Sequence, residues 1–213
     1  MNFLKNIIRS LYIFFLQCRQ KLFYRKNLDV IHDYWKEPND GHNNPKSYVI
    51  NQKGHKNSKN MVSLIKELIT TDGKILEIGV NAGRNLSHLY SEGYKNLFGI
   101  EISKNALNEF ERSFGDCYKN SKIINDSVEN AIINIDDKSI DVIYTMAVLQ
   151  HIHPKSEWIF EHMSRICRGY IITFEDEFWV SDRHFPRDYK KVFEKVGMRQ
   201  LYKKQGARIF KKG

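Results

Sequence analysis

The feature that most constrains this chain is a regular alternation of short apolar runs with amphipathic segments across its last two thirds. Apolar strands that alternate with helices indicate βαβ units, which build a mostly parallel sheet covered by helices on both faces. Two last apolar runs flank the turn sequence KQG and predict an antiparallel closing pair. The predicted strands are 74–78, 96–100, 122–124, 140–145, 170–174, 198–203 and 207–210. The predicted helices are 84–91, 104–114, 155–166 and 186–196.

A glycine-containing turn, ILEIGVNAGRN, follows the first predicted strand at residues 75–85. Ligands of doubly wound sheets bind beyond the carboxyl ends of the strands, so this turn is the expected site. The dinucleotide pattern GxGxxG places glycine at three positions, where this chain has Gly79, Asn81 and Arg84. NAD is therefore disfavoured, and the absence of a following Gly-Lys-Ser/Thr sequence also disfavours a P-loop.

The turn resembles motif I of class I S-adenosylmethionine-dependent methyltransferases, whose form is E/D-x-G-x-G-x-G. The chain has Glu77, Gly79, Asn81 and Gly83 at these positions, with asparagine in place of the middle glycine. Asparagine is among the residues that best tolerate a left-handed backbone, so we expect the turn to keep its shape. The resemblance implies S-adenosylmethionine as cofactor and a Rossmann-like, doubly wound, mostly parallel seven-stranded α/β sheet.

Residues at the next strand ends extend the resemblance. Glu101 ends the second strand in LFGIEIS, where an acid accepts the ribose hydroxyls, and Asp126 in IINDSVE matches the family's acid beside the adenine amino group. Each acid also has a structural reading, since Glu77 could pair within the core and Asp126 could cap the next helix. The resemblance implies a cofactor site formed by Glu77, Gly79, Asn81, Gly83, Asn85, Glu101, Ile102, Asp126, Ser127 and Thr145.

Candidate catalytic residues follow the fourth and fifth strands. Methyl transfer is an in-line displacement, so the enzyme aligns the nucleophile and removes its proton. His151 in QHIHP is the first candidate base, because a neutral imidazole accepts a proton near pH 7; packing or lining the pocket is its alternative role. Glu175 in TFEDEF is the second candidate, as a base or a substrate contact. No spacing of His, Cys, Asp or Glu matches a recognised ligand set, so we predict no metal.

The sequence after the fourth strand bears on the methyl acceptor. Methyltransferases of DNA bases and glutamine amides carry N/D-P-P-Y/F there, whereas this chain has TMAVLQH. We therefore expect O-methylation of a small-molecule or glycan acceptor. The layout also resembles bacterial methylases of surface-sugar and polysaccharide biosynthesis. The alternatives are an RNA methyltransferase, and a non-catalytic protein that binds the cofactor and docks to a membrane.

Positive charge is concentrated at the two ends of the chain. Residues 1–28 carry six Lys/Arg and no acid, and residues 183–213 carry eleven Lys/Arg and two acids. Apolar residues in 1–28 recur every three to four positions, which predicts a basic amphipathic helix. Its longest apolar run, six residues, is too short to span a bilayer. We expect this helix to bind an anionic membrane surface, or to pack on the core domain or on a second subunit, and we do not expect nucleic acid as a partner.

The chain is expected to divide into three segments. These are the helix 1–28, an Asn-rich cap or linker with a lead-in helix at 29–68, and the methyltransferase domain 69–213. Turn-forming residues dominate 34–60, but Trp35, Tyr48 and Val49 are larger than a solvated linker needs, so this loop is expected to cover a ligand site. Three cysteines without metal or CxxC spacing predict free thiols and a cytoplasmic protein. If the N-terminal helix binds lipid, the protein is expected to be peripheral at the inner membrane face. A homo-oligomer is left open.

Overall fold

A computed structural model describes residues 27–38, 41–204 and 206–213, together with 7–8, 10–12, 14–15 and 18. Most of the predicted N-terminal helix 1–28 therefore lies outside the described residues, although the residues that are described between positions 7 and 18 are helical. Ser10 of this segment accepts a hydrogen bond from the Lys191 ammonium at 3.1 Å. No helix in the described parts of the chain is long and apolar enough to cross a membrane.

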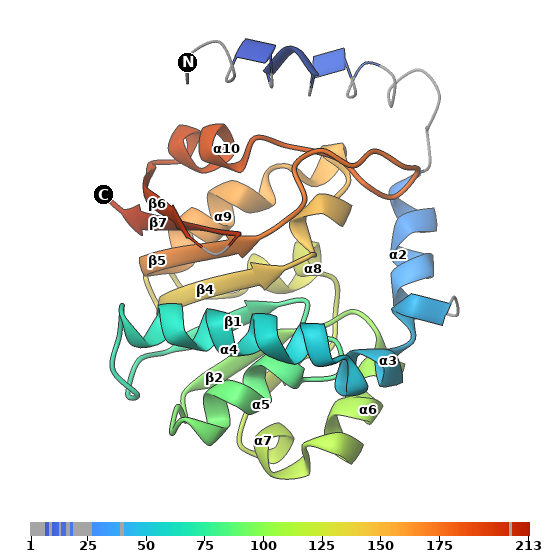
Figure 1. Ribbon diagram of the computed structural model, residues 1–213, viewed down its shortest axis with the longest axis vertical. Coiled ribbons are helices and arrows are strands. Elements are labelled where there is room, and N and C mark those ends of the chain that lie inside the picture. Colours follow the sequence, from blue (N-terminus) through green and yellow to red (C-terminus); the bar gives the residue numbers. More distant parts are fainter. Residues whose placement is uncertain are drawn as a thin grey trace.

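The centre of the fold is a seven-stranded sheet with the order β3-β2-β1-β4-β5-β7-β6 (Figure 1). The first five strands in this order are parallel, and β7 runs antiparallel to both of its neighbours. The mostly parallel sheet and its antiparallel closing pair are thus confirmed. The strands are β1 (Ile75–Ile78), β2 (Leu97–Ile100), β3 (Lys122–Ile124), β4 (Ile140–Met146), β5 (Cys167–Phe174), β6 (Met198–Lys204) and β7 (Ala207–Lys212).

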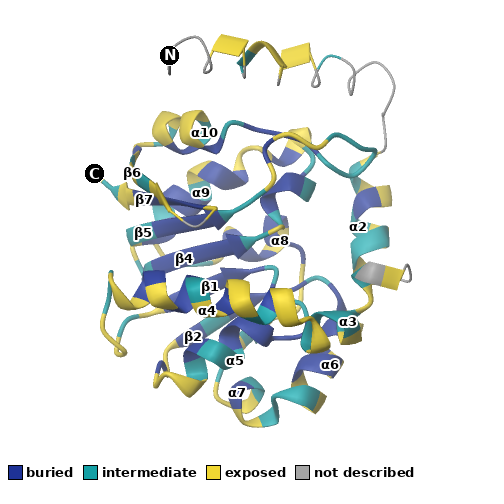
Figure 2. Ribbon diagram, viewed as in Figure 1, coloured by how far each residue is buried: buried dark blue, intermediate teal, exposed yellow. Residues whose placement is uncertain are grey.

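Helices cover both faces of the sheet, and a buried apolar cluster lies under each layer. Figure 2 shows the buried strands between helices whose outer surfaces are exposed. The helices are α2 (Leu28–Lys36), α3 (Pro45–Ile50), α4 (Gln52–Lys66), α5 (Arg84–Ser91), α6 (Lys104–Ser113), α7 (Gly115–Lys119), α8 (Val128–Ile132), α9 (Ile159–Ile166) and α10 (Tyr189–Lys195). Short 3₁₀ turns are η1 (Gly41–Asn43), η2 (Leu149–His151) and η3 (Pro154–Ser156).

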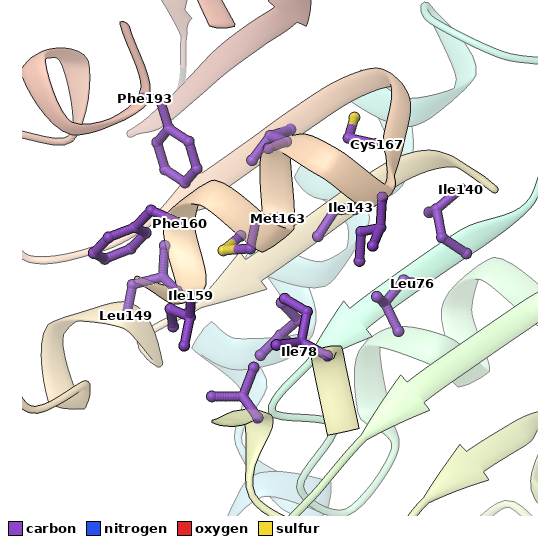
Figure 3. Close-up of a cluster of buried hydrophobic side chains, with 14 of the residues drawn as sticks. Leu76, Ile78, Ile140, Ile143, Leu149, Ile159, Phe160, Met163, Cys167 and Phe193 are labelled. Atoms are coloured by element: carbon purple, nitrogen blue, oxygen red, sulfur yellow. The ribbon is translucent and has the colours of Figure 1, made fainter. Parts of the chain in front are cut away.

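The two core clusters follow from the alternation of side chains along the strands. Leu76 and Ile78 of β1 point to one face, where α8, α9 and α10 pack; Figure 3 shows Ile159, Phe160 and Met163 of α9 in this cluster. The other face packs against α4, α5, α6 and α7. Because helices cover both faces of the central strands and exclude water from them, the sequences of these strands are apolar almost without interruption.

The stretch predicted as loop at 34–60 is mostly helical, and that prediction was wrong. It contains the end of α2, all of α3 and the first half of α4. Its asparagines act as helix caps: the Asn44 side chain accepts from the Lys46 amide, and the Asn51 side chain accepts from the Gly54 amide. Asparagine favours both loops and N-caps, so composition alone did not separate the two.

Two predicted helices begin later than expected. The helix predicted at 155–166 starts at Ile159, because His153 caps the separate turn η3 through its Nδ1 and the Lys155 amide, 3.1 Å apart. The helix predicted at 186–196 starts at Tyr189, where Asp188 provides the cap. The free thiols are confirmed for Cys18, Cys117 and Cys167, and burial raises the pKa of the Cys117 and Cys167 thiols to about 11 and about 12.

Candidate active site

A cavity lies beyond the carboxyl ends of β1, β2, β3 and β4, where ligands of this sheet architecture bind. Its floor comes from the β1–α5 turn and from the segments after β2 and β3. Its roof comes from Trp35 of α2, Tyr48 of α3 and Pro38 of the segment between these helices. Residues far apart in the sequence therefore enclose one site, and the expected cap function of Trp35 and Tyr48 agrees with their position.

The β1–α5 turn has the backbone that its sequence predicts. Gly79 and Gly83 have φ of 78° and 75°, and Asn81 has φ of 50°, so asparagine occupies the left-handed position of the missing glycine. The Asn81 side chain accepts a hydrogen bond from the Ala82 amide at 2.7 Å, which stabilises this conformation. A Cβ on Gly79 would lie 2.3 Å from the Val148 side chain, so only glycine fits at this wall of the cavity.

Glu101 lies directly after β2, buried at the cavity wall. Its two carboxylate oxygens accept from the Asn81 and Ser103 amides, each at 2.8 Å. Burial raises the pKa of this carboxyl, and the backbone donors oppose the rise. Glu101 therefore connects the β1–α5 turn to the start of α6 and presents an acid to the cavity.

Glu77 lies inside β1 and does not line the cavity. Its oxygens accept from the Asn85 amide group at 2.6 Å and from the Tyr144 hydroxyl at 2.7 Å. Burial raises its pKa to about 8, and the hydrogen bonds from Asn85 and Tyr144 oppose the rise. This network fixes β1 against α5 and β4, and it matches the core-pairing alternative for Glu77.

Asp126 and Ser127 lie between β3 and α8, and both line the cavity. Ser127 is the N-cap of α8, and its hydroxyl accepts from the Asn130 amide at 3.3 Å. Asp126 Oδ1 accepts from the Ser127 amide at 2.7 Å and from the Asn130 side chain at 3.0 Å. The cap belongs to Ser127, and Asp126 supports it while facing the cavity.

The roof of the cavity is connected to its floor by an ion pair. His32 of α2 lies 3.2 Å, Nε2 to Oε1, from Glu129 of α8, and both residues line the cavity. The hydrogen bond with Glu129 raises the pKa of His32. The pair therefore holds α2 over the site more strongly when His32 is protonated.

His151 lies under the roof, between the rings of Trp35 and His184, at centroid distances of 4.4 Å to each. Its Nδ1 is 2.7 Å from the Arg183 carbonyl oxygen, so Nδ1 carries the proton and Nε2 is the acceptor. The Gln150 amide nitrogen is 3.4 Å from Nε2. Burial lowers the pKa of His151 to about 3, which keeps the ring neutral at physiological pH.

Glu175 lies after β5 and does not line the cavity. Its carboxylate accepts from the Val148 and Gln150 amides, both at 3.2 Å. Between these contacts and β4, Ala147 has φ of 57°, a backbone region that costs a non-glycine residue about 1–3 kcal/mol. Burial raises the pKa of Glu175 to about 7. Glu175 is placed to hold the β4–η2 segment in shape, rather than to contact a ligand directly.

The predicted site residues thus fall into two groups. Those that line the cavity are Gly79, Asn81, Asn85, Glu101, Ile102, Asp126, Ser127 and His151. Those that lie behind its walls are Glu77, Gly83, Thr145 and Glu175. One lining residue, Arg84, was not predicted as part of the site, although its place at the third glycine of the dinucleotide pattern had set it apart.

Comparisons with known proteins agree with this architecture. Residues 75–169 match the family described as "Methyltransferase domain", and no curated protein matches the chain. Magnesium protoporphyrin IX methyltransferase of Synechocystis PCC 6803, solved with bound SAM, superposes with a TM-score of 0.64 at 14% identity, over 88% of this chain and 100% of that one.

Two further solved structures share the fold. A TehB-like SAM-dependent methyltransferase of Corynebacterium glutamicum has a TM-score of 0.59 at 16% identity, covering 79% of this chain and 98% of that one. Phosphoethanolamine N-methyltransferase 2 of Haemonchus contortus has a TM-score of 0.62 at 14% identity, covering 79% of this chain and 44% of that one. Identities this low establish the Rossmann-like fold alone.

Proposed function

We propose that this chain, which belongs to the class I S-adenosylmethionine-dependent methyltransferases, transfers the cofactor's methyl group to a hydroxyl of a small-molecule or glycan acceptor. The observation that carries the proposal is a pair of polar groups under the roof of the cavity. Trp35 Nε1 is a buried donor with no partner among the described residues, and His151 Nε2 is an acceptor on the adjacent ring. A hydroxyl satisfies both, because it accepts from one and donates to the other.

The residues at the strand ends fit the cofactor. S-adenosylmethionine combines a ribose diol and an adenine with a charged amino-acid end, and the cavity offers an acid after each of β2 and β3, Glu101 and Asp126, among apolar residues such as Ile102 and Val128. Because Gly79 has no Cβ, the Val148 side chain can pack against the turn and complete this wall of the cavity. When bound, the cofactor supplies an electrophilic methyl group on a sulfonium sulfur.

The chemistry of the roof favours a hydroxyl acceptor over an alkylamine. An amine is an ammonium ion at neutral pH, and an ammonium has no lone pair to accept the Trp35 N–H. Such a cation would also share the cavity with the guanidinium of Arg84, and the repulsion between the two positive charges would make binding of the amine less favourable. These two effects support O-methylation.

His151 is proposed to align the acceptor hydroxyl. Its Nε2 would accept the hydroxyl hydrogen bond and take up the proton that the hydroxyl loses on methylation. A pKa of about 3 makes His151 a weak base, so its effect is chiefly on orientation. Glu175 is proposed as a positioning residue, since it fixes the segment that carries His151.

Trp35→Phe is expected to lower kcat/KM for a hydroxyl acceptor about fivefold, since one hydrogen bond contributes about 1 kcal/mol. The phenyl ring keeps the packing against His151 but removes the N–H donor. Activity is measured as S-adenosylhomocysteine released from a panel of sugars, phenols and primary amines. The affinity for S-adenosylhomocysteine should remain within about twofold of wild type, since the roof groups contact the acceptor.

Trp158→Phe is the matched control, because Trp158 is 39% exposed and packs against His162 at 5.3 Å. It should have wild-type kinetics. Turnover of amines alone, or an unchanged kcat/KM in Trp35→Phe, would contradict the assignment of a hydroxyl.

We also propose that the N-terminal segment binds an anionic membrane surface at the cytoplasmic face. Its described large apolar side chains are 40–64% exposed: Ile7, Ile8, Leu11, Tyr12, Phe14 and Phe15. With six basic residues and no acid in 1–28, this composition suits a helix that lies in the lipid interface. A membrane-bound enzyme would meet lipid-linked acceptors directly.

The double change of Phe14 and Phe15 to Asp should weaken binding to phosphatidylglycerol-containing vesicles by at least about tenfold, because each phenylalanine contributes about 1.5–3 kcal/mol when buried. Co-sedimentation with the vesicles measures the bound fraction. Ile133→Asp, at an exposed apolar residue of the core domain, is the control and should bind as wild type does. Equal binding by the double variant would show that another surface makes the contact.

A further inference from the structure

One side of α2 carries a stripe of side chains that face the cavity. This α2 stripe consists of Leu28, Ile31, His32 and Trp35, which all line the cavity. Their intervals of three and four residues place them on the same side of the helix. Val30, on the other side, is 48% exposed. Three of the four members of the stripe are apolar, so α2 presents a mainly apolar surface to the cavity.

The α2 stripe does not take part in the hydrophobic core. Ile31 is only 2% exposed, yet it belongs to neither of the two core clusters, and the same holds for Leu28 and Trp35. The apolar side of a helix in a globular protein ordinarily packs on the core. The apolar side of α2 packs over the cavity instead, so its burial is explained by the cavity and not by the core.

The wall across the cavity from α2 is apolar as well. α8 lies on that side, because His32 of α2 and Glu129 of α8 are 3.2 Å apart, Nε2 to Oε1. Val128 of α8 and Ile152, directly after η2, line the cavity and belong to the core cluster under α8, α9 and α10. Because the core supports these side chains from behind, this wall is a fixed hydrocarbon surface.

The polar groups between the two walls have distinct positions. His32 and Glu129 pair with each other, so the pair does not require a charged ligand. Trp35 Nε1 and His151 Nε2, which the proposed function assigns to the acceptor hydroxyl, lie at the C-terminal end of the α2 stripe. From Trp35 back to Leu28 the stripe extends over seven residues, about 10 Å of helix. The space under α2 therefore has a polar end and an apolar length.

We propose that the methyl acceptor is an apolar hydroxy compound, a phenol or an aliphatic alcohol, whose hydrocarbon body lies along the α2 stripe. The inference rests on the proposed function and narrows its acceptor from small molecules and glycans to hydroxy compounds of this class. A hydrocarbon body gains free energy by leaving water for these walls. A sugar would bring several hydroxyls against them, and each hydroxyl would lose hydrogen bonds to water without replacement.

The test uses straight-chain primary alcohols from butanol to decanol, with 2-naphthol as the phenol and methyl α-glucoside as the sugar. Calorimetry measures binding to the full chain saturated with S-adenosylhomocysteine, and turnover gives kcat/KM. The affinity for the alcohols should rise about two- to fourfold per methylene, and the rise should stop when the chain exceeds about 10 Å. Octanol and 2-naphthol should each bind at least about 100-fold more tightly than methyl α-glucoside.

Variants of the α2 stripe connect this preference to the structure. Ile31→Asn places an amide in the middle of the stripe and should weaken binding of octanol and 2-naphthol about tenfold. Leu28→Asn, at the far end, should weaken binding of decanol and leave butanol unchanged, a dependence on length that a loss of folding would not produce. Val30→Asn is the matched control on the exposed side of the same helix and should bind as wild type does. All three should keep the affinity for S-adenosylhomocysteine within about twofold.

The outcomes separate this inference from the proposed function. Tighter binding and faster methylation of the sugar would overturn the apolar acceptor and leave O-methylation standing. An affinity that does not depend on chain length, or equal effects of Ile31→Asn and Val30→Asn, would also overturn the inference. Turnover of amines alone would overturn the proposed function, and the assignment of a hydroxy compound would fail with it.

Discussion

Glu101→Gln is expected to lower the affinity for S-adenosylhomocysteine by about 100-fold, equivalent to about 2.7 kcal/mol. Both oxygens of Glu101 already accept backbone amides, at 2.8 Å each, and each retains capacity for a ligand hydroxyl. Glutamine has one oxygen only, so its amide N–H₂ would face a backbone N–H donor. The substitution removes the charge-assisted acceptor and also disturbs Asn81 in the β1–α5 turn.

Glu109→Gln is the matched control for this measurement. Glu109 is also a buried carboxylate, on α6, but it pairs with Arg112 and does not line the cavity. Calorimetric titration with S-adenosylhomocysteine should give wild-type affinity for this variant. Comparable losses in both variants would indicate a general cost of removing a buried charge, and no loss in Glu101→Gln would remove Glu101 from the cofactor site.

The floor of the site could be predicted from the sequence because its determinants are local. Gly79, Asn81 and Gly83 fix the turn through their own backbone preferences, and Asn81 takes the left-handed conformation expected of it. Glu101 and Asp126 follow strands that end at one edge of a parallel sheet. Spacing along the chain therefore determines their positions in space.

The roof could not be predicted in the same way. Residues 34–60 have the composition of a loop, yet Asn44 and Asn51 begin helices. Whether an asparagine caps a helix or ends one depends on the apolar contacts of the following turns, such as those of Met61 and Leu64 with the core. Those contacts join elements distant in the sequence.

The properties of His151 also depend on distant residues. Its sequence context predicts an imidazole near its ordinary pKa, whereas Trp35 and His184 enclose the ring and burial lowers the value to about 3. The partners of Arg84, Ser58 and the Tyr48 carbonyl, likewise come from α4 and α3. The sequence identifies a titratable side chain, but its pKa and its partners depend on residues that only the folded structure brings into contact with it.

Gly83 is a motif residue that the packing of the fold requires, and it does not line the cavity. Sequence resemblance places it in the cofactor site, yet it lies behind the wall of the cavity, against the ring of Phe110. Phe110 is fully buried and packs edge-on against Tyr118 at 5.3 Å, so it has little room to move. The glycine at this position is explained by the close approach of α5 to α6.

Gly83→Ala is therefore expected to lower the free energy of unfolding by about 2–5 kcal/mol. The left-handed backbone, with φ of 75°, contributes about 1–2 kcal/mol of this cost. The added Cβ would lie 2.0 Å from the Phe110 ring, and overpacking of a buried ring contributes about 1–3 kcal/mol more. Urea denaturation followed by circular dichroism measures the change.

Gly93→Ala isolates the backbone cost in the same protein. Gly93 has φ of 94°, but its nearest atom to an added Cβ is a Thr71 methyl carbon at 3.7 Å, an ordinary contact. This variant should lose only about 1–2 kcal/mol, the strain of the backbone alone. A difference of about 2 kcal/mol between the two variants would measure the Phe110 clash. Equal losses would mean that Phe110 yields to the methyl group, and the conformation of the turn would then be the sole reason for glycine at position 83.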